Sequence, residues 1–294
     1  MDDQFTFLDR RKTFEQKYFE NLKELDVLKS ISVVDISTTD FCNRTCVFCP
    51  HHDPKVFPNR YLRMTAVGAK VIAEKLQQIN YTGTIAISGF GENLLNPDVF
   101  EIITVLKNHN PEAFIECNTN GDPLNKKTVK KIFDTPLDCL NINLYDGPEQ
   151  VEKFNKLLVD IPKERYTYRG HWGKEDHGII YNNRSGVITW LGKEDLSKKG
   201  SCYYPFYKLF VDWNGDVLFC ANDWGREKVI GNLLQQSLQE IWLSKEMRKV
   251  RQTLLEEGRT FSPCNNCNVH GTLVGQKSVD ILSSYEKNRN NRVK

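Results

Sequence analysis

The sequence predicts an α/β protein: a parallel β/α barrel, complete or partial, followed by a small second domain. Two observations support this fold class. From about residue 31 to 172, short apolar runs alternate with segments of helical spacing, a pattern typical of parallel βαβ units. From about residue 200 the alternation gives way to a hairpin pattern, two short helices and a pair of cysteines.

The barrel elements follow one another in a regular order. Strands are expected at 32–37, 83–88, 113–119, 138–145 and 165–172, and helices at 65–79, 96–109, 125–134 and 148–161. Thr65 and Asn96 are candidate N-caps, and Pro97 suits a first helical turn. Active sites of parallel barrels lie at the C-terminal ends of the strands, so we expect functional residues directly after each strand.

The second domain begins with two alternating runs that flank Asn214 and Gly215, a signal for a type I′ hairpin. Ser237 and Ser244 are candidate caps of the two helices that follow. We divide the chain into a helical extension (1–30), the barrel (31–180), a linker with the second domain (181–275) and a polar tail (276–294) whose end should fray. A metal cluster would compensate for the small core of the second domain.

Composition narrows the class of protein. The chain has 294 residues, 39% hydrophobic and 27% charged, and a net charge of +2, which are ordinary values for a soluble globular protein. The small net charge argues against a strongly basic nucleic-acid-binding surface. The N-terminus lacks a signal-peptide pattern, and no run approaches the roughly 18 apolar residues of a membrane helix. We therefore expect a cytoplasmic protein without a nucleic-acid or membrane partner.

The nine cysteines carry the main functional signal. Their number is odd, which disfavours a closed disulfide framework. Three of them follow the first strand, and four more form a second group: Cys42, Cys46 and Cys49, then Cys202, Cys220, Cys264 and Cys267. Zinc completed by His51 or His52 would suit the first group, and four thiolates would suit zinc or an iron–sulfur cluster in the second.

Four segments resemble motifs of the radical S-adenosylmethionine (SAM) superfamily. The first group has the spacing Cys-x3-Cys-x-aromatic-Cys, with Phe48 before the third cysteine. Residues 89–95 are similar to the GGEPLL motif, with Asn93 where proline is usual. Residues 119–121 match TNG, and residues 143–150 are similar to the SLDG element. The resemblance covers residues 32–172.

This resemblance implies a partial parallel (β/α)6 barrel, a cofactor and a set of contacts. Cys42, Cys46 and Cys49 would hold a 4Fe–4S cluster whose fourth iron chelates SAM, and an electron from the cluster would release a 5′-deoxyadenosyl radical. Candidate SAM contacts are Phe48, Gly89, Gly91, Glu92, Asn120, Asn143 and Arg169.

Residues 200–271 resemble a Twitch domain, the short form of the SPASM domain. This second resemblance implies that Cys202, Cys220, Cys264 and Cys267 hold an auxiliary 4Fe–4S cluster. All four positions would be filled by protein, so the auxiliary cluster would accept or relay an electron and would not bind substrate.

Strand alternation predicts which side chains face the barrel interior. The predicted polar lining is Asp35, Ser37, Asn118, Asn141, Asn143, Thr167, Arg169 and His171. Candidate catalytic residues are Glu116, Arg169, Tyr145 and Cys139. Glu116 is a base, a substrate anchor or a structural carboxylate, and Cys139 or Cys117 is a hydrogen-atom donor or a core residue.

The layout is similar to that of aminocyclitol dehydrogenases of the butirosin-pathway kind. This implies oxidation of a carbinol carbon of a small sugar or aminocyclitol, with flavodoxin or ferredoxin as the reductant. Radical epimerisation with a cysteine donor and modification of a ribosomal peptide are alternatives. A non-catalytic zinc-binding protein is the alternative from a different class.

Overall fold

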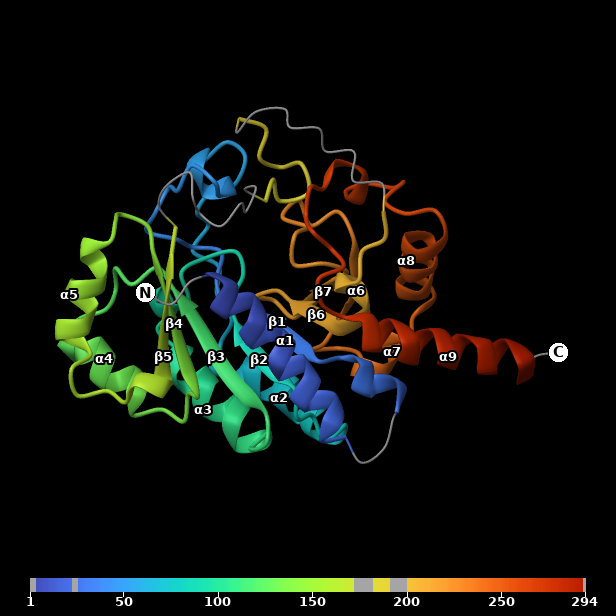
Figure 1. Cartoon of the computed structure of the whole chain (residues 1–294), viewed down its shortest axis with the longest axis horizontal. Coiled ribbons are helices and arrows are strands. Elements are labelled where there is room, and N and C mark those ends of the chain that lie inside the picture. Colours follow the sequence, from blue (N-terminus) through green and yellow to red (C-terminus); the bar gives the residue numbers. More distant parts are fainter. Residues whose placement is uncertain (1–3, 23–25, 172–181, 191–199, 293–294) are drawn as a thin grey trace.

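A computed structural model describes residues 4–22, 26–171, 182–190 and 200–292. One eight-stranded sheet in the order β5-β4-β3-β2-β1-β6-β7-β8 forms its centre (Figure 1). The strands are β1 (Val33–Ile36), β2 (Thr84–Ile87), β3 (Phe114–Thr119), β4 (Cys139–Leu144), β5 (Tyr166–Gly170), β6 (Lys208–Val211), β7 (Asp216–Leu218) and β8 (Val229–Asn232). Neighbours from β5 through β6 pair in parallel, and β7 and β8 are antiparallel. The sheet has two edges, so the barrel is partial, as predicted.

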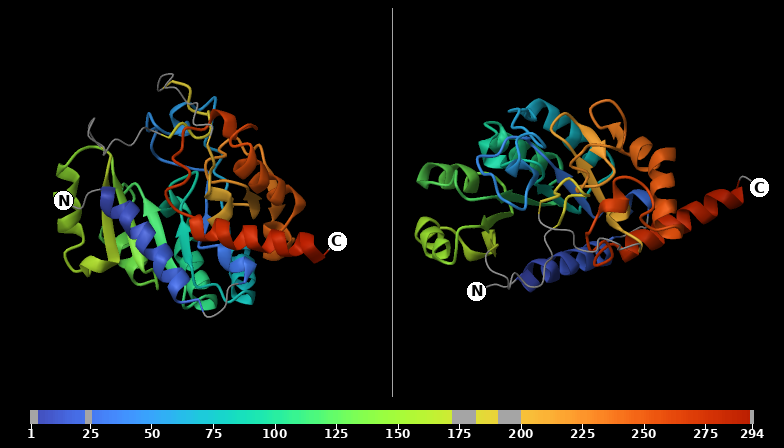
Figure 2. Two further views of the ribbon diagram at one scale, coloured as in Figure 1. Left: turned by 45° about the vertical axis from the view of Figure 1, so that its right-hand side comes forward. Right: turned by 90° about the horizontal axis from the view of Figure 1, so that it is seen from above.

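The helices divide between the two faces of this sheet (Figures 1 and 2). They are α1 (Gln4–Glu20), α2 (Ala66–Gln78), α3 (Val99–His109), α4 (Lys126–Phe133), α5 (Glu149–Leu157), α6 (Tyr204–Tyr207), α7 (Leu238–Trp242), α8 (Lys245–Glu256) and α9 (Gln276–Arg292). Helices α2 to α5 each follow a parallel strand and cover one face, and α1 crosses the other. None of the helices in the described ranges has the length and apolar character needed to span a bilayer.

Strand alternation sets the core as the sequence predicts. Leu140, Ile142 and Leu144 of β4 are fully buried in the helix-facing core. Cys117 of β3 lies in the same core. The alternate residues of β3 and β4 face the inner side of the sheet, where the polar groups gather.

Three of the four predicted helix caps are present. The Oγ1 atom of Thr65 accepts a hydrogen bond from Gly68 N at 3.1 Å. Ser237 forms a capping box with Glu240, and Ser244 caps α8.

The prediction that Asn96 caps a helix is confirmed only in part. Helix α3 begins at Val99, so Asn96 is not the residue directly before it, but Asn96 Oδ1 accepts from Asp98 N at 3.0 Å and caps the turn that leads into the helix. The Nδ2 atom of Asn96 donates to Thr38 O at 3.0 Å and to Met64 O at 2.9 Å, and the residue is 1% exposed. Asn96 therefore joins the segment after β1 to the start of α2, because two buried carbonyl groups there need a donor.

The predicted hairpin is present, but its turn is not type I′. A type I′ turn needs positive φ at both central residues. Gly215 has φ +84°, whereas Asn214 is absent from the positive-φ residues of the described chain. The Asn214 side chain accepts from Asp216 N at 3.1 Å, and Asp212 O accepts from Gly215 N at 2.9 Å. These bonds fix an ordinary turn with the glycine in the left-handed position after it.

The hairpin is also continuous with the barrel sheet. Strand β6 pairs in parallel with β1, with Val33 opposite Lys208 and Ile36 opposite Val211. One sheet thus runs through the predicted barrel (31–180) and the predicted linker with the second domain (181–275). The division of the chain into four parts therefore stays a prediction. Within the linker, residues 182–190 form turns; residues 172–181 and 191–199, which include the end of the strand predicted at 165–172, lie outside the described ranges.

The predicted polar tail is not frayed over most of its length, because residues 276–292 form α9. Val279 and Leu282 are spaced by one helical turn and are buried. The Oγ atom of Ser278 donates to Ser30 O at 2.7 Å in a buried contact. A narrow apolar stripe within a polar sequence is thus enough to hold the helix on the body of the protein.

Helix α1 closes the inner side of the sheet through a buried charge cluster. Glu116 of β3 is fully buried. Its Oε2 atom lies 2.8 Å from Arg10 Nη2, and Oε1 pairs with Arg11. The ring of Phe14 lies 4.7 Å from that of Phe114. The two guanidinium groups and this ring contact hold α1 against the sheet.

We predict that Glu116→Gln lowers the free energy of unfolding by about 3 to 5 kcal/mol, because it leaves two guanidinium groups without their counter-charge. Arg11 and Arg10 lower the pKa of Glu116 although burial alone would raise it. Its stabilising effect is therefore complete above the usual carboxylate pKa and is lost as the pH falls through the lower folded value. Urea unfolding at several pH values measures both effects.

The control is Glu74→Gln, which removes an exposed pair with Lys70 and should cost less than about 0.5 kcal/mol. Equal unfolding midpoints for Glu116→Gln and the wild type would contradict the assignment of a stabilising charge cluster.

Candidate active site

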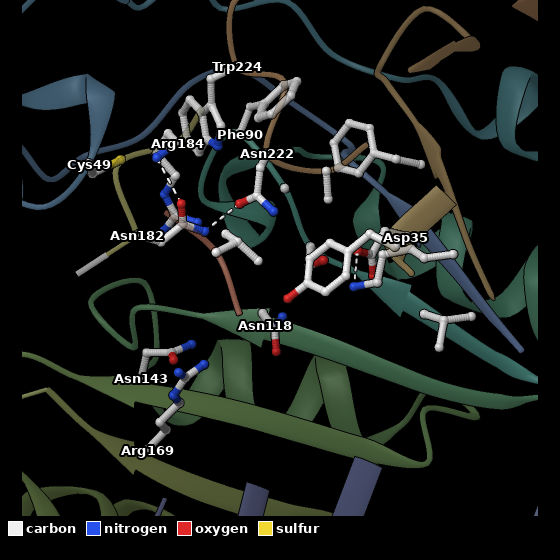
Figure 3. A pocket seen from close by; sticks show the side chains of 18 of the residues that line it. Asp35, Cys49, Phe90, Asn118, Asn143, Arg169, Asn182, Arg184, Asn222 and Trp224 are labelled. Atoms are coloured by element: carbon white, nitrogen blue, oxygen red, sulfur yellow. Dashed lines mark hydrogen bonds and ion pairs between the residues drawn. The ribbon is translucent and has the colours of Figure 1, made fainter. Parts of the chain in front are cut away.

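A cavity of about 800 Å³ runs along the inner face of the sheet, from the C-terminal strand ends toward α1 (Figure 3). Its wall contains most of the predicted site residues: Cys42, Cys46, Phe48, Cys49, Gly89, Gly91, Glu92, Asn120, Asn143, Tyr145 and Arg169. Asn182 and Arg184 reach it from the linker, and Asn222, Trp224 and Asn268 from the C-terminal unit. Segments far apart in the chain thus share one cavity.

The loop after β1 presents its three thiols to this cavity. Cys49 N donates to Cys46 O at 2.9 Å, and Arg44 N donates to Cys42 Sγ at 3.5 Å. Burial raises the pKa of Cys42 to about 12 and that of Cys46 to about 11, and the neighbouring thiols add to both shifts. Such thiols stay protonated until a metal centre displaces their protons.

The surroundings of these thiols fit a cluster better than a zinc ion. His51 Nε2 lies 2.6 Å from Phe90 O, and His52 Nδ1 lies 3.1 Å from Thr45 O. Both histidines considered as a fourth zinc ligand therefore contact carbonyl groups. Sulfur donors around an open space suit iron–sulfur chemistry.

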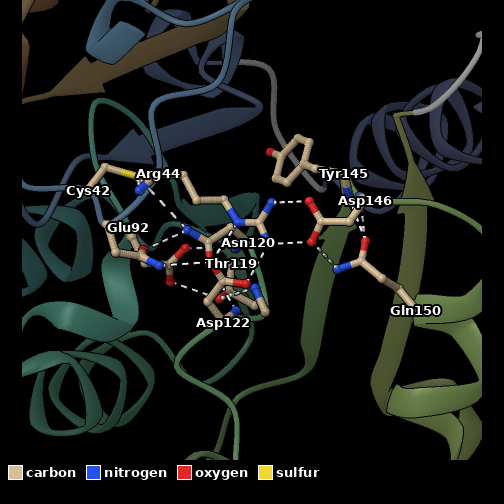
Figure 4. A network of polar contacts seen from close by, with 11 residues as sticks. Cys42, Arg44, Glu92, Thr119, Asn120, Asp122, Tyr145, Asp146 and Gln150 are labelled. Atoms are coloured by element: carbon tan, nitrogen blue, oxygen red, sulfur yellow. Dashed lines mark hydrogen bonds and ion pairs between the residues drawn. The ribbon is translucent and has the colours of Figure 1, made fainter.

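Glu92 is the centre of a buried polar network (Figure 4). Its Oε1 atom accepts from Thr119 Oγ1 at 2.8 Å and from Leu94 N at 3.1 Å, and its Oε2 atom accepts from Asn120 N at 2.6 Å. Burial raises the pKa of Glu92 to about 7. An ionised carboxylate has about four acceptor sites, so three of these bonds leave room for one more donor from a ligand.

Two glycines allow the cysteine loop to approach this network closely. Gly89 has φ +138°, and a Cβ atom there would lie 2.5 Å from Ser37 Cβ. A Cβ atom on Gly91 would lie 2.5 Å from Phe41 O and 2.6 Å from Thr39 O. Any larger residue would therefore push apart the loop after β1 and the loop after β2.

Asn93 is a functional residue that sequence reasoning missed. It is 2% exposed, and its Oδ1 atom accepts from Thr38 Oγ1 at 2.8 Å. Its Nδ2 atom donates to Ile87 O at 3.3 Å and to Asn118 O at 3.2 Å. Asn93 thus ties together the ends of β1, β2 and β3. The only sign of this role in the sequence is that Asn93 stands where the family usually has proline. Its hydrogen-bond partners lie in distant segments, so the role itself could not be predicted.

Arg44, between the first two cysteines, is a second missed residue. Its guanidinium bonds Asp122 after β3 at 2.5 and 2.6 Å and Asp146 after β4 at 2.7 Å (Figure 4). It also lies 5.5 Å from the ring centre of Tyr145. These paired bonds fix the cysteine loop to two strand ends.

An aromatic wall closes one side of the cavity. The rings of Tyr145 and His171 stack at 4.9 Å, and Phe48 lies 5.4 Å from Tyr145. Burial and the charges of Arg169 and Arg184 lower the pKa of His171 to about 3, so its imidazole is neutral. Because His171 is neutral, this wall is an uncharged stacking surface.

Two predicted catalytic residues lie away from the cavity wall. Glu116 is held by Arg10 and Arg11 beneath α1. Cys139 accepts from Arg10 Nη1 at 3.5 Å on the same side. Neither side chain lines this cavity, because Arg10 and Arg11 of α1 lie beside them. The two salt bridges favour the structural role among the alternatives for Glu116, and catalytic roles for Glu116 and Cys139 stay predictions.

The second cysteine group converges on another, much smaller cavity. Cys202, Cys220, Cys264 and Cys267 all line it. Cys267 N donates to Cys264 O at 3.1 Å in the turn between them. Tyr204 and Asn222 line both cavities. Three buried thiols and the half-buried thiol of Cys220 line one small cavity, which fits a closed iron–sulfur site next to the large cavity.

Comparison with protein families agrees with both cysteine sites. Residues 36–166 match the radical SAM superfamily, and residues 202–268 match SPASM, an iron–sulfur cluster-binding domain. The chain therefore carries a radical SAM domain and an iron–sulfur cluster-binding domain. SAM and two iron–sulfur clusters are its cofactors.

Individual relatives resemble the chain over different lengths. It is 26% identical to the S-adenosyl-L-methionine-dependent 2-deoxy-scyllo-inosamine dehydrogenase of Niallia circulans, over 82% of this chain and 94% of that protein. It is 35% identical to a probable GTP 3′,8-cyclase of Methanococcus aeolicus over only 46% and 44%. The structure of BtrN in complex with AdoMet and 2-DOIA has a TM-score of 0.71 at 24% identity, over 84% and 96%, which shows a shared fold.

We predict that Asn93→Leu lowers the free energy of unfolding by about 3 kcal/mol, because it leaves buried groups on three strands without partners. It should also weaken SAM binding, since the Glu92 loop loses its anchor. Urea unfolding and equilibrium dialysis with SAM measure the two effects. The exposed Asn155→Ala variant should alter neither. Unchanged SAM affinity in Asn93→Leu would contradict the proposed anchoring.

We further predict that SAM affinity rises several-fold as the pH increases through about 7, because ionised Glu92 attracts the SAM ammonium group. Glu92→Gln should bind SAM more weakly and lose this pH dependence. Isothermal titration at a series of pH values tests this. An identical pH profile in the variant would assign the dependence to another group.

Proposed function

We propose that this enzyme oxidises a secondary alcohol of an aminocyclitol or a related small sugar to a ketone. The observation that carries this proposal is the wall shared by the two cavities: Tyr204 and Asn222 face both the large cavity and the four thiols of the small cavity. A carbinol substrate in the large cavity would then lie beside an electron acceptor. The similarity to an inosamine dehydrogenase over most of both chains supports the same reaction.

The cofactors would be held by the two cysteine groups. Cys42, Cys46 and Cys49 would hold the cluster that, together with SAM, would supply a 5′-deoxyadenosyl radical as hydrogen-atom acceptor, and the other four cysteines would hold a cluster that would supply the electron acceptor. The chain's own residues have to bind, orient and shield the substrate.

Polar side chains on the cavity wall would bind the substrate. Asn118, Asn182 and Asn268 present amides that can donate to and accept from hydroxyl groups. Asp35 lies 2.7 Å from Lys208 Nζ, and both line the cavity. This pair offers a carboxylate toward a substrate amine and an ammonium toward a hydroxyl oxygen.

Two of the predicted catalytic residues keep a role in this proposal. Arg169 and Tyr145 line the cavity beside Asn143. Burial raises the pKa of Tyr145, so its hydroxyl stays protonated and acts as a hydrogen-bond donor. We assign both residues to positioning SAM or the substrate, with Arg169 binding a carboxylate or hydroxyl oxygen.

The alternatives have less support. A radical epimerase needs a thiol hydrogen-atom donor at the substrate, yet the cysteines lining the large cavity in the described ranges are the three predicted cluster ligands. A peptide-modifying enzyme would be expected to bind a leader segment, whereas α1 is held on the sheet by Arg10 and Arg11. Flavodoxin or ferredoxin as reductant, and a cytoplasmic location, remain expectations from the sequence.

We predict about eight irons per chain after anaerobic reconstitution and about four in the Cys42/Cys46/Cys49→Ala triple variant. Only the wild type should form 5′-deoxyadenosine with a chemical reductant. With 2-deoxy-scyllo-inosamine or a related cyclitol as probe, mass spectrometry should detect a product lighter by two hydrogens.

Bound zinc and no SAM cleavage would overturn the proposal. SAM cleavage with deuterium exchanged into an unoxidised cyclitol would favour the epimerase.

A further inference from the structure

Arg259 is a buried cation beside the auxiliary cysteines. It is 7% exposed and lines the small cavity together with all four thiols. Its Nη1 atom donates to Cys267 O at 3.2 Å, and its Nε atom is buried without a hydrogen-bond partner in the described part of the chain. No carboxylate pairs with it among the described residues. A buried cation of this kind calls for an anionic partner.

The position of Gly271 shows how close Arg259 lies to a thiol. A Cβ atom at Gly271 would be 2.4 Å from Cys202 Sγ and 2.6 Å from Arg259 Nη2, so these two atoms are at most about 5 Å apart. Because Gly271 has no side chain, Cys202 Sγ and Arg259 Nη2 can lie this close together.

We propose that Arg259 is the counter-charge of the auxiliary cluster and sets its ability to accept an electron. This rests on the proposed function, in which the four cysteines hold that cluster. Four thiolates and an iron–sulfur core carry net negative charge, which grows when an electron is added. A fixed positive charge within about 5 Å favours the reduced form by well over tenfold at an effective dielectric constant near 20.

Asn222, on the side of the proposed substrate, provides a second interaction that favours the reduced cluster. Its backbone N donates to Cys220 Sγ at 3.4 Å and its Nδ2 atom at 3.8 Å. Hydrogen bonds to cluster sulfurs also favour the reduced form. Asn222 lines both cavities, so this stabilisation lies where the electron would arrive from the substrate.

The alternative role of Arg259 is purely structural, through its hydrogen bond to Cys267 O. The reduction potential of the auxiliary cluster distinguishes this role from that of a counter-charge. The test uses the full chain with Cys42, Cys46 and Cys49 replaced by alanine, so that one cluster remains. Redox titration followed by electron paramagnetic resonance gives its midpoint potential without any substrate. Arg259→Gln is compared with Arg259→Lys, which keeps the charge.

Arg251→Lys is the matched control. Arg251 is 4% exposed, but its guanidinium bonds Pro205 O and Trp242 O and does not line the small cavity. It should lower stability and leave the potential unchanged.

We expect Arg259→Gln to lower the equilibrium constant for reduction of the cluster at least tenfold, which is about 59 mV for one electron. The midpoint potential of Arg259→Lys should stay near that of the parent protein.

An unchanged potential in Arg259→Gln, with four irons retained, would overturn this inference alone. If Arg259→Gln loses its iron, Asn222→Ala takes its place, and its potential should fall in the same direction; an unchanged value there would also overturn the inference. A parent without iron in the auxiliary site would overturn the proposed function itself.

Discussion

The pairing of β1 on both of its edges is the constraint on which the site depends. Val33 lies opposite Thr84 of β2 on one side and opposite Lys208 of β6 on the other, all in parallel. The C-terminal ends of β1 and β6 lie at the same edge of the sheet, and the first three cysteines follow this end of β1. Strand β7 runs back along β6, with Leu218 opposite Phe210, so Cys220 lies near the start of β6. Two groups of thiols separated by about half the chain therefore lie toward opposite ends of this strand pair and line neighbouring cavities.

The two buried glutamates of the inner side show how surroundings decide the role of a carboxyl group. Glu116 lies against two guanidinium groups, which lower its pKa and tie it to α1. Glu92 lies among neutral donors, and burial raises its pKa to about 7. Only Glu92 can gain much from a cation brought by a ligand, because its charge is not already balanced. The first closes the sheet, and the second is available for SAM.

Periodicity and motif order predicted the strands, the inward polar face and the residues that line the cavity. These rest on spacing within short segments, as do the caps at Thr65 and Ser237. The contributions of Asn93 and Arg44 could not be predicted, because their partners lie on other strand ends. Asn96 caps the turn before α3 through its Oδ1 atom, but the bonds that its Nδ2 atom donates to distant carbonyl groups could not be predicted. Helix α9 was missed because its apolar stripe has few residues.

The arginines near the two thiol groups are balanced differently, which suggests a direction for electron flow. Arg44 lies in the SAM-site loop, but Asp122 and Asp146 take up its charge, and Arg44 and Asp146 shift the pKa of Cys46 in opposite directions. Arg259 has no carboxylate partner within salt-bridge distance among the described residues, although Asp223 acts on Cys264 in the opposite direction. A centre beside an unpaired cation accepts an electron more readily than one beside a neutralised pair. The proposed counter-charge at Arg259 would thus favour reduction of the auxiliary site, as oxidation of an alcohol requires.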